Sequence, residues 1–275
     1  MVPASPFRLL QRLALSAGLM LAARAAAADA LDQWTWMGPA AKDSFKGDNY
    51  AGVYYNQDKA MVAVVGSGFK VLLRKDADPA WRIMDAGTQH PLYGITFANN
   101  AFFAVGARGS LVTSKDGETW ENRDSTVTVP LFCVMYTPSV FVAVGDGGTV
   151  ITSRAGGEWT THPSSVITAL NSVTFAGRAF VAVGSNGTIL TSPTGQTRTP
   201  QKSGTEETLH GVAFGHDTFV AVGSGGTILT SADGVTWQAR VSGVRHSLRA
   251  VTFGHGTFWA VGSNGAILES APLGG

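Results

Sequence analysis

Five chemically different side chains stand 39 residues apart in this chain, each directly after a leucine. They are Tyr93, Phe132, Asn171, His210 and Arg249. The residues around them repeat, whereas this position changes from copy to copy. A purely structural position would keep one residue type, so we expect these side chains either to contact a ligand or to plug a channel. Two aromatic rings, an amide, an imidazole and a guanidinium suit a peptide segment or a small polar ligand.

An enzymatic role for the same region would need further residues. Glycoside hydrolysis with a tyrosine nucleophile also needs an acid–base pair and, for acidic sugars, arginines that hold a carboxylate. Arg108, Arg245 and Arg249 could supply the arginines and Tyr93 the nucleophile. The sequence contains no visible Ser–His–Asp or Cys–His set, and its histidines lack metal-ligand spacing. We therefore predict neither a metal nor a cofactor.

The elements that hold these side chains follow from a repeat of the same length. A phenylalanine recurs at Phe102, Phe141, Phe180, Phe219 and Phe258, and a glycine follows it four residues later. Each repeat has four short runs rich in Val, Ile, Phe and Thr; in the second repeat they are 92–97, 101–105, 110–114 and 119–122. Such runs are typical of strands. Four antiparallel strands in about 40 residues predict one blade of a β-propeller.

The connections of such a blade place its residues on two faces. The links between the second and third strands are two residues between glycines, which favours tight turns with positive φ. The first strand begins on the face to which these turns return, and the turn between the third and fourth strands lies on the opposite face. Propellers bind ligands where the first strands converge on the axis. We therefore call the five residues after leucine the axial positions, and expect Arg108 and Arg245 on their face.

A second series counts the blades. It runs Trp81, Trp120, Trp159, Arg198 and Trp237, so its next member would be residue 276, just beyond the end of the chain. The missing strand has a counterpart near the N-terminus, where Asp32 and Trp36 have the spacing of Asp116 and Trp120. The sequence predicts an all-β, six-bladed β-propeller of four-stranded blades, closed by an N-terminal strand that completes the last blade.

The first 30 residues differ from the repeats. Arg8 and Arg12 precede an apolar run and an alanine-rich stretch, which predicts a signal peptide over 1–30 with cleavage near Ala28 or Ala30. A retained membrane anchor is the alternative, although the apolar run is shorter than the ~20 residues of a span. We expect residues 31–275 to form a single periplasmic or secreted domain, monomeric and without a membrane span.

The net charge limits the class of partner that is expected, and the cysteine content limits the chemistry. Without Arg8, Arg12 and Arg24, 17 basic residues face 19 acidic ones, and this net charge near −2 argues against nucleic acid. The lone Cys133 stands in an apolar strand, where a small buried side chain is expected rather than a reactive thiol.

Two motifs carry a resemblance to known families. The residues Ser114, Asp116, Gly117 and Trp120, and again Ser231, Asp233, Gly234 and Trp237, resemble the Asp-box of the BNR repeat of the sialidase superfamily. That resemblance implies a structural role, in which the aspartate caps backbone N–H groups and the tryptophan packs between blades. Asp32 and Trp36 would belong to the same set.

The whole repeat is similar to the YCF48/HCF136-like propellers, which are photosystem II assembly factors and their bacterial relatives. This similarity implies an exported, non-enzymatic factor that binds a protein partner in an envelope or membrane complex. A sialidase-like glycoside hydrolase or a glycan-binding propeller is the alternative, but no Arg-Ile-Pro motif is present and residues 81–84 match it only in part. A structural module without a small ligand is the third possibility.

Overall fold

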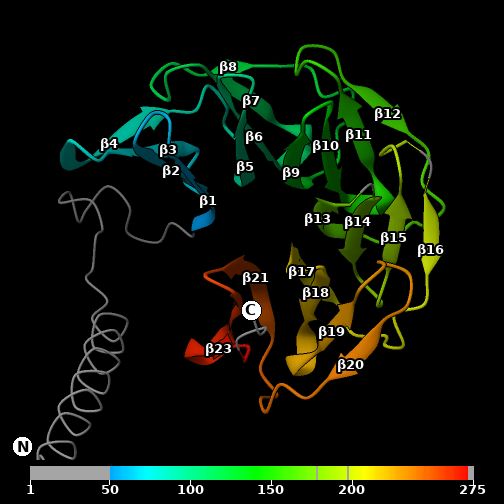
Figure 1. The fold of residues 1–275 in the computed structure, drawn as a ribbon. Coiled ribbons are helices and arrows are strands. Elements are labelled where there is room, and N and C mark those ends of the chain that lie inside the picture. The colour runs from blue at the N-terminus through cyan, green and yellow to red at the C-terminus, as the bar shows by residue number, and fades with distance from the viewer. Residues whose placement is uncertain (1–49, 178, 197, 272–275) are drawn as a thin grey trace, which may run out of the picture. The chain divides into compact units, whose positions relative to one another are not determined.

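The strands form consecutive antiparallel sheets in a computed structural model that describes residues 50–177, 179–196 and 198–271 (Figure 1). Within these residues, five sheets have four strands and the last sheet has three. The strands of each sheet are hydrogen-bonded in chain order, and each sheet is one blade. The predicted six-bladed, all-β propeller is confirmed.

Each blade begins with an inner strand, and the inner strands of successive blades pack side by side. The inner strands are β1 (Tyr50–Asn56), β5 (Leu92–Ala98), β9 (Leu131–Thr137), β13 (Leu170–Ala176), β17 (Leu209–Gly215) and β21 (Leu248–Gly254). The second strands are β2 (Met61–Gly66), β6 (Ala101–Gly106), β10 (Val140–Gly145), β14 (Ala179–Gly184), β18 (Thr218–Gly223) and β22 (Thr257–Gly262).

The third and fourth strands are shorter in most blades and lie toward the rim. The third strands are β3 (Lys70–Lys75), β7 (Leu111–Ser114), β11 (Val150–Ser153), β15 (Ile189–Ser192), β19 (Ile228–Ser231) and β23 (Ile267–Glu269). The fourth strands are β4 (Asp78–Asp85), β8 (Glu121–Asn122), β12 (Thr160–His162), β16 (Thr199–Gln201) and β20 (Gln238–Arg240).

Two strand boundaries differ from the prediction because nearby backbone N–H groups donate hydrogen bonds within turns. The fourth strand of blade 2 was expected over 119–122, but β8 begins at Glu121 because the Thr119 amide donates to Asp116. The third strand was expected from Ser110, whose amide instead closes the preceding turn onto the Ala107 carbonyl oxygen. A backbone N–H group that donates a hydrogen bond within a turn cannot also pair with a neighbouring strand.

The core consists of apolar layers between neighbouring blades. Between blades 1 and 2, Leu73 of β3 packs in one cluster with Phe102 and Trp120, both of which are buried. The rings of Phe102 and Trp120 have their centroids 6.0 Å apart. Because the repeat places the same residue types in each blade, equivalent layers recur along the chain. Each layer removes large aromatic and aliphatic side chains from water, the main stabilising term in a fold.

Small residues let the inner strands approach each other. A Cβ at Gly94 would stand 2.9 Å from the Phe132 carbonyl oxygen of the next inner strand. The equivalent positions in the other blades hold Gly52, Cys133, Ser172, Gly211 and Ala250. Cys133 is thus one of a series of small side chains, and burial raises the pKa of its thiol.

The turns between second and third strands have the predicted positive φ. In blade 3 the turn Asp146–Gly148 contains Gly147 at φ 61° and Gly148 at φ 71°. A Cβ on Gly148 would overlap the Val166 carbonyl oxygen, whereas a Cβ on Gly147 would meet open space. In blades 2 to 6 the first of these two positions varies and the second is always glycine, and the difference in space accounts for that pattern.

The predicted signal peptide and the predicted closing strand lie outside the described residues. Within the described residues, no helix has both the length and the apolar character needed to cross a bilayer.

Candidate functional site

Each axial position is the extra residue of a β-bulge at the start of an inner strand. In blade 2, Leu92 pairs with Gly106 and Gly94 pairs with Val105, which leaves Tyr93 outside the ladder. The registers of β9, β13, β17 and β21 skip one residue in the same way, at Phe132, Asn171, His210 and Arg249. A bulge bends a strand and redirects a side chain. One backbone device therefore presents all five side chains.

Strand register separates the axial positions from the Asp-box turns. Leu92, beside Tyr93, pairs with Gly106 at the end of β6, whereas Ser114, which opens the Asp-box turn, pairs with Phe102 near its start. The two sets thus lie at opposite ends of the second strand. We call these ends the axial face, where the inner strands begin, and the Asp-box face.

The aromatic part of the axial face is made by blades 2 and 3. The rings of Tyr93 and Phe132 contact each other with centroids 5.8 Å apart and planes tilted by 41°. Both side chains are partly buried. They therefore form an apolar surface that is still open to solvent.

The polar part is made by blades 4 to 6. The Asn171 amide nitrogen donates to the Leu209 carbonyl oxygen of the next inner strand at 2.9 Å. The His210 Nε2 atom is 3.0 Å from the Ser224 hydroxyl. Partial burial lowers the pKa of His210, and the nearby Arg249 guanidinium lowers it further. Arg249 is exposed, so the cation at the end of this arc is accessible.

The structure adds a sixth axial position that the repeat spacing missed. Tyr50 pairs with Gly66 and Gly52 pairs with Val65, so the bulged residue of blade 1 is Ala51. Spacing alone pointed to residue 54, because blade 1 is irregular in length. Ala51 is exposed and carries only a methyl group. Blade 1 therefore contributes no large side chain at this position.

The two other predicted arginines lie outside the inner strands, in a turn and in a loop. Arg108 is exposed at the tip of the turn Ala107–Gly109, and Arg245 is exposed in the loop before β21. Among the described residues, no hydrogen bond or ion pair between a carboxylate and Tyr93 occurs.

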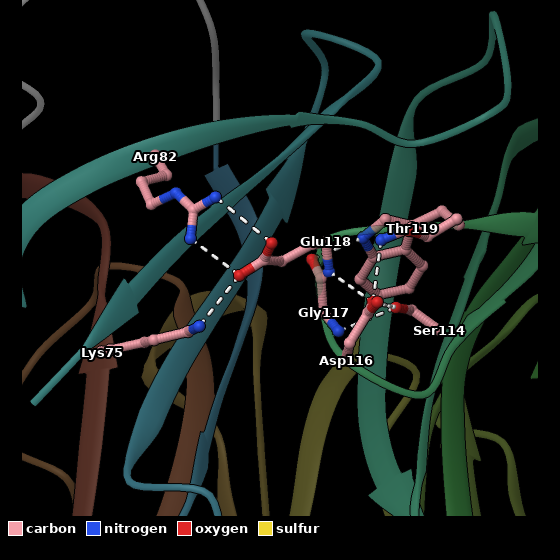
Figure 2. A network of polar contacts seen from close by, with 8 residues as sticks. Lys75, Arg82, Ser114, Asp116, Gly117, Glu118 and Thr119 are labelled. Atoms are coloured by element: carbon pink, nitrogen blue, oxygen red, sulfur yellow. Dashed lines mark hydrogen bonds and ion pairs between the residues drawn. The ribbon is translucent and has the colours of Figure 1, made fainter.

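The Asp-box turn of blade 2 is organised by one carboxylate (Figure 2). One oxygen of Asp116 accepts the backbone N–H groups of Glu118 and Thr119, both at 2.8 Å, and the Ser114 hydroxyl at 3.0 Å. Led by the two backbone bonds, these interactions lower the pKa of Asp116 to about 2. The Trp120 indole donates to the Gly117 carbonyl oxygen at 2.9 Å.

Blade 5 repeats this turn. Asp233 accepts from the amides of Val235 and Thr236, the Ser231 hydroxyl donates to the same carboxylate, and the Trp237 indole donates to the Gly234 carbonyl oxygen. The pKa of Asp233 is likewise lowered to about 2, mainly by the Thr236 and Val235 amides. Both carboxylates are therefore occupied by their own turns. Asp32 and Trp36, the third predicted set, lie outside the described residues.

Glu118 connects the blade 2 turn to blade 1 (Figure 2). Its carboxylate forms ion pairs with Lys75 at 2.9 Å and Arg82 at 2.7 Å. Hydrogen bonds from these two side chains lower the pKa of Glu118. All three groups are partly exposed, so this network contributes little to stability.

A series of serines in the loops between blades was not identified from the sequence. The Ser125 hydroxyl donates to the Gly109 carbonyl oxygen at 2.6 Å and lies near the Val127 carbonyl oxygen. Ser164, Ser203 and Ser242 make the equivalent bond to the carbonyl oxygen two residues later. Their spacing of 39 residues was the available signal. They hold the loop that leads into each next inner strand.

No group of three or more potential metal-ligating His, Cys, Asp or Glu side chains occurs within the described residues.

Comparisons with known proteins agree with this architecture. The family described as the DUF6242 beta propeller domain matches residues 31–169, about half of the chain. No curated protein matches. The solved structure titled "YCF48 bound to D1 peptide" is similar with a TM-score of 0.66 and 17% identity, over 81% of this chain and 77% of that one. YCF48 from Cyanidioschyzon merolae has a TM-score of 0.65 and 16% identity, over 81% and 82% of the two chains. The predicted resemblance to YCF48-like propellers is confirmed at the level of the fold.

Proposed function

We propose that this chain, which belongs to the DUF6242 beta propeller domain family, binds a segment of a partner protein on its axial face and does not act as an enzyme. The observation that carries the proposal is the arc of five bulged side chains. A backbone that repeats while its bulged side chain changes is suited to the recognition of one particular ligand.

The chemistry of the arc favours a peptide segment. Tyr93 and Phe132 offer apolar area for a hydrophobic side chain, and Arg249 offers an exposed cation for a carbonyl or carboxylate. Aromatic and arginine side chains are common energetic centres of protein interfaces. A YCF48 structure that carries a D1 peptide shares the propeller fold, which supports a peptide as the ligand class by analogy.

The basic, apolar and alanine-rich order of residues 1–30 supports export. On that basis the partner would be a periplasmic protein or an envelope complex, and the chain would serve as a binding, assembly or stability factor.

The first experiment identifies the partner, and the second tests whether the axial face binds it. Pull-down from the native envelope should recover a protein whose binding segment can then be measured by calorimetry. Arg249→Ala should weaken this binding by about 1–3 kcal/mol, because it removes a charge-assisted bond. Its melting temperature should change little, since Arg249 is exposed.

Asp116→Ala is the matched control from the opposite face. It should lower the melting temperature and leave the affinity unchanged, because Asp116 caps its own turn. If Arg249→Ala and His210→Ala instead lost stability and bound normally, the axial side chains would be a plug. Hydrolysis of sialosides by the purified protein, abolished by Arg249→Ala, would contradict the non-enzymatic part of the proposal.

A further inference from the structure

The loops that lead into blades 3 to 6 are held at the same place on the axial face. In each loop a serine hydroxyl donates to the carbonyl oxygen two residues later, and a glycine of the preceding blade's turn packs so closely against that oxygen that no Cβ would fit. The leucine that opens each inner strand is fully buried and holds the other end of the loop. The loop backbone is therefore fixed at two points.

One exposed residue follows the held carbonyl group in each of these loops. We call it the middle position, because it lies between the rim of the propeller and the axial position four residues later. With the residue at the same spacing before blade 2, the middle positions are Gln89, Thr128, Ile167, Glu206 and Arg245. All five are exposed, and their residue type changes from loop to loop. An exposed side chain on a fixed backbone loses little freedom when it makes a contact.

The middle positions of blades 4 to 6 carry three different chemistries. Ile167 is 92% exposed and adds an aliphatic side chain to the blade next to Phe132. Glu206 and Arg245 follow in the next two loops, and within the part of the chain that the structure describes neither forms an ion pair. The fold does not require these residue types, since the same position accepts Thr128. Charges that are unpaired within the molecule remain available to a partner.

We propose that these three middle positions select the partner segment, which presents an apolar side chain to Ile167, a basic one to Glu206 and an acidic one to Arg245. The inference rests on the proposed function, because it places a peptide segment on the axial face. The axial positions of the same three blades are an amide, an imidazole and a guanidinium, so they offer no carboxylate to a basic residue. Glu206 adds this requirement, and the neighbouring opposite charges disfavour a segment with the reverse order.

Selection from short random peptides displayed on phage tests this chemistry with the full chain as the target. The wild type should enrich peptides that combine an apolar residue, a Lys or Arg and an Asp or Glu. Because Glu207 is also exposed, Glu206→Gln is combined with Glu207→Gln. This variant should lose the enrichment of Lys and Arg and keep that of Asp and Glu, since the arginines of the axial face remain.

A variant with the same change in net charge is the control for this selection. Asp146→Asn in the turn of blade 3 is combined with Asp217→Asn on the Asp-box face, and both aspartates are exposed. Their removal should leave the enrichment of Lys and Arg as in the wild type. An equal loss in both variants would show that net charge, rather than the middle position, selects the peptide.

A peptide from the wild-type selection then tests the apolar position by fluorescence anisotropy. Ile167→Thr introduces the residue found at position 128 and should weaken binding about fivefold, because apolar contact of about two methylene groups is lost. Val241→Thr is the matched control, since Val241 is 99% exposed but directly follows the fourth strand of blade 5 at the rim. It should bind as the wild type does. Both variants should keep the wild-type melting temperature, because the side chains are exposed.

The outcomes separate this inference from the proposed function. If Arg249→Ala weakens peptide binding while Ile167→Thr or the variant without Glu206 and Glu207 behaves as its control, the axial face binds peptides but the middle positions do not select them. That result overturns the inference alone. If the wild type enriches no peptide, or if binding does not depend on Arg249, the proposed function fails as well.

Discussion

At the scale of single residues, charged side chains have different roles on the axial face and on the Asp-box face. The carboxylates of Asp116 and Asp233 accept hydrogen bonds from backbone N–H groups of their own turns. Arg249 is exposed beside His210, and its charge contributes to the lowered pKa of that histidine. Charged groups that are committed to a turn stabilise the fold, whereas an exposed one remains available to a partner.

The capping aspartates predict a pH dependence of stability. The folded pKa of Asp116 is about 2, below the ordinary value of 3.8. Its stabilising effect is therefore complete above pH 3.8 and is lost as the pH falls toward 2, because the unfolded chain takes up the proton first. Urea unfolding of wild type and Asp116→Asn should differ most at neutral pH and converge only as the pH approaches 2.

Asp217→Asn in the turn between β17 and β18 is the control for this measurement. Asp217 is exposed with positive φ, a conformation that asparagine also adopts readily. Its unfolding curve at neutral pH should follow that of wild type. A difference between wild type and Asp116→Asn that does not change with pH would show that the carboxylate charge is not what stabilises the turn.

At the scale of elements, the turn between the second and third strands determines how a blade meets the next loop. Gly148 faces the Val166 carbonyl oxygen, and the Ser164 hydroxyl donates to that same oxygen at 2.9 Å. The turn of one blade and the loop that leads into the next blade are thus packed together. This contact depends on the absence of a Cβ at one position.

Two substitutions in the same turn should therefore differ strongly. Gly148→Ala should destabilise the protein by more than about 2 kcal/mol, because it adds a backbone clash to the cost of a left-handed conformation. Gly147→Asn should cost less than about 1 kcal/mol, since Asn186 and Asn264 occupy the equivalent positions with positive φ. Chemical denaturation measures both, and equal losses would show that space at Gly148 is not limiting.

At the scale of the whole molecule, stability depends on contacts between neighbouring blades. Each blade buries its apolar faces only against the blades beside it, as in other repeat proteins. The first and last blades carry exposed apolar residues, among them Val53, Val261 and Ile267. Exposed apolar side chains of this kind favour association when they form a contiguous patch.

Removal of residues 31–37 tests the prediction that an N-terminal strand completes the last blade. The truncated protein should aggregate or melt at a markedly lower temperature, because β23 would keep a free edge and the terminal apolar faces would be exposed. Size-exclusion chromatography with light scattering, together with a thermal unfolding curve, measures both effects. A truncated protein that is monomeric and as stable as wild type would show that these residues do not close the propeller.

The sequence by itself determined the blades, because strands and turns are local and repeat with their residues. The positions of Phe102, Phe219 and the glycine turns specify strand alternation and positive φ without reference to distant parts of the chain. The axial positions could also be identified, since a variable residue inside a constant pattern is visible in one sequence.

Only the tertiary structure decided how these residues meet. The bulge that presents Tyr93, the contact of Tyr93 with Phe132 and the effect of Arg249 on His210 depend on register and on packing between inner strands. Spacing missed Ala51 because blade 1 departs from the repeat, and only its pairing with β2 places it. An apolar cavity lined by Val220, Phe258 and Leu268 likewise exists only between the packed blades 5 and 6. Such features depend on contacts between residues far apart in the chain, which a period in the sequence does not specify.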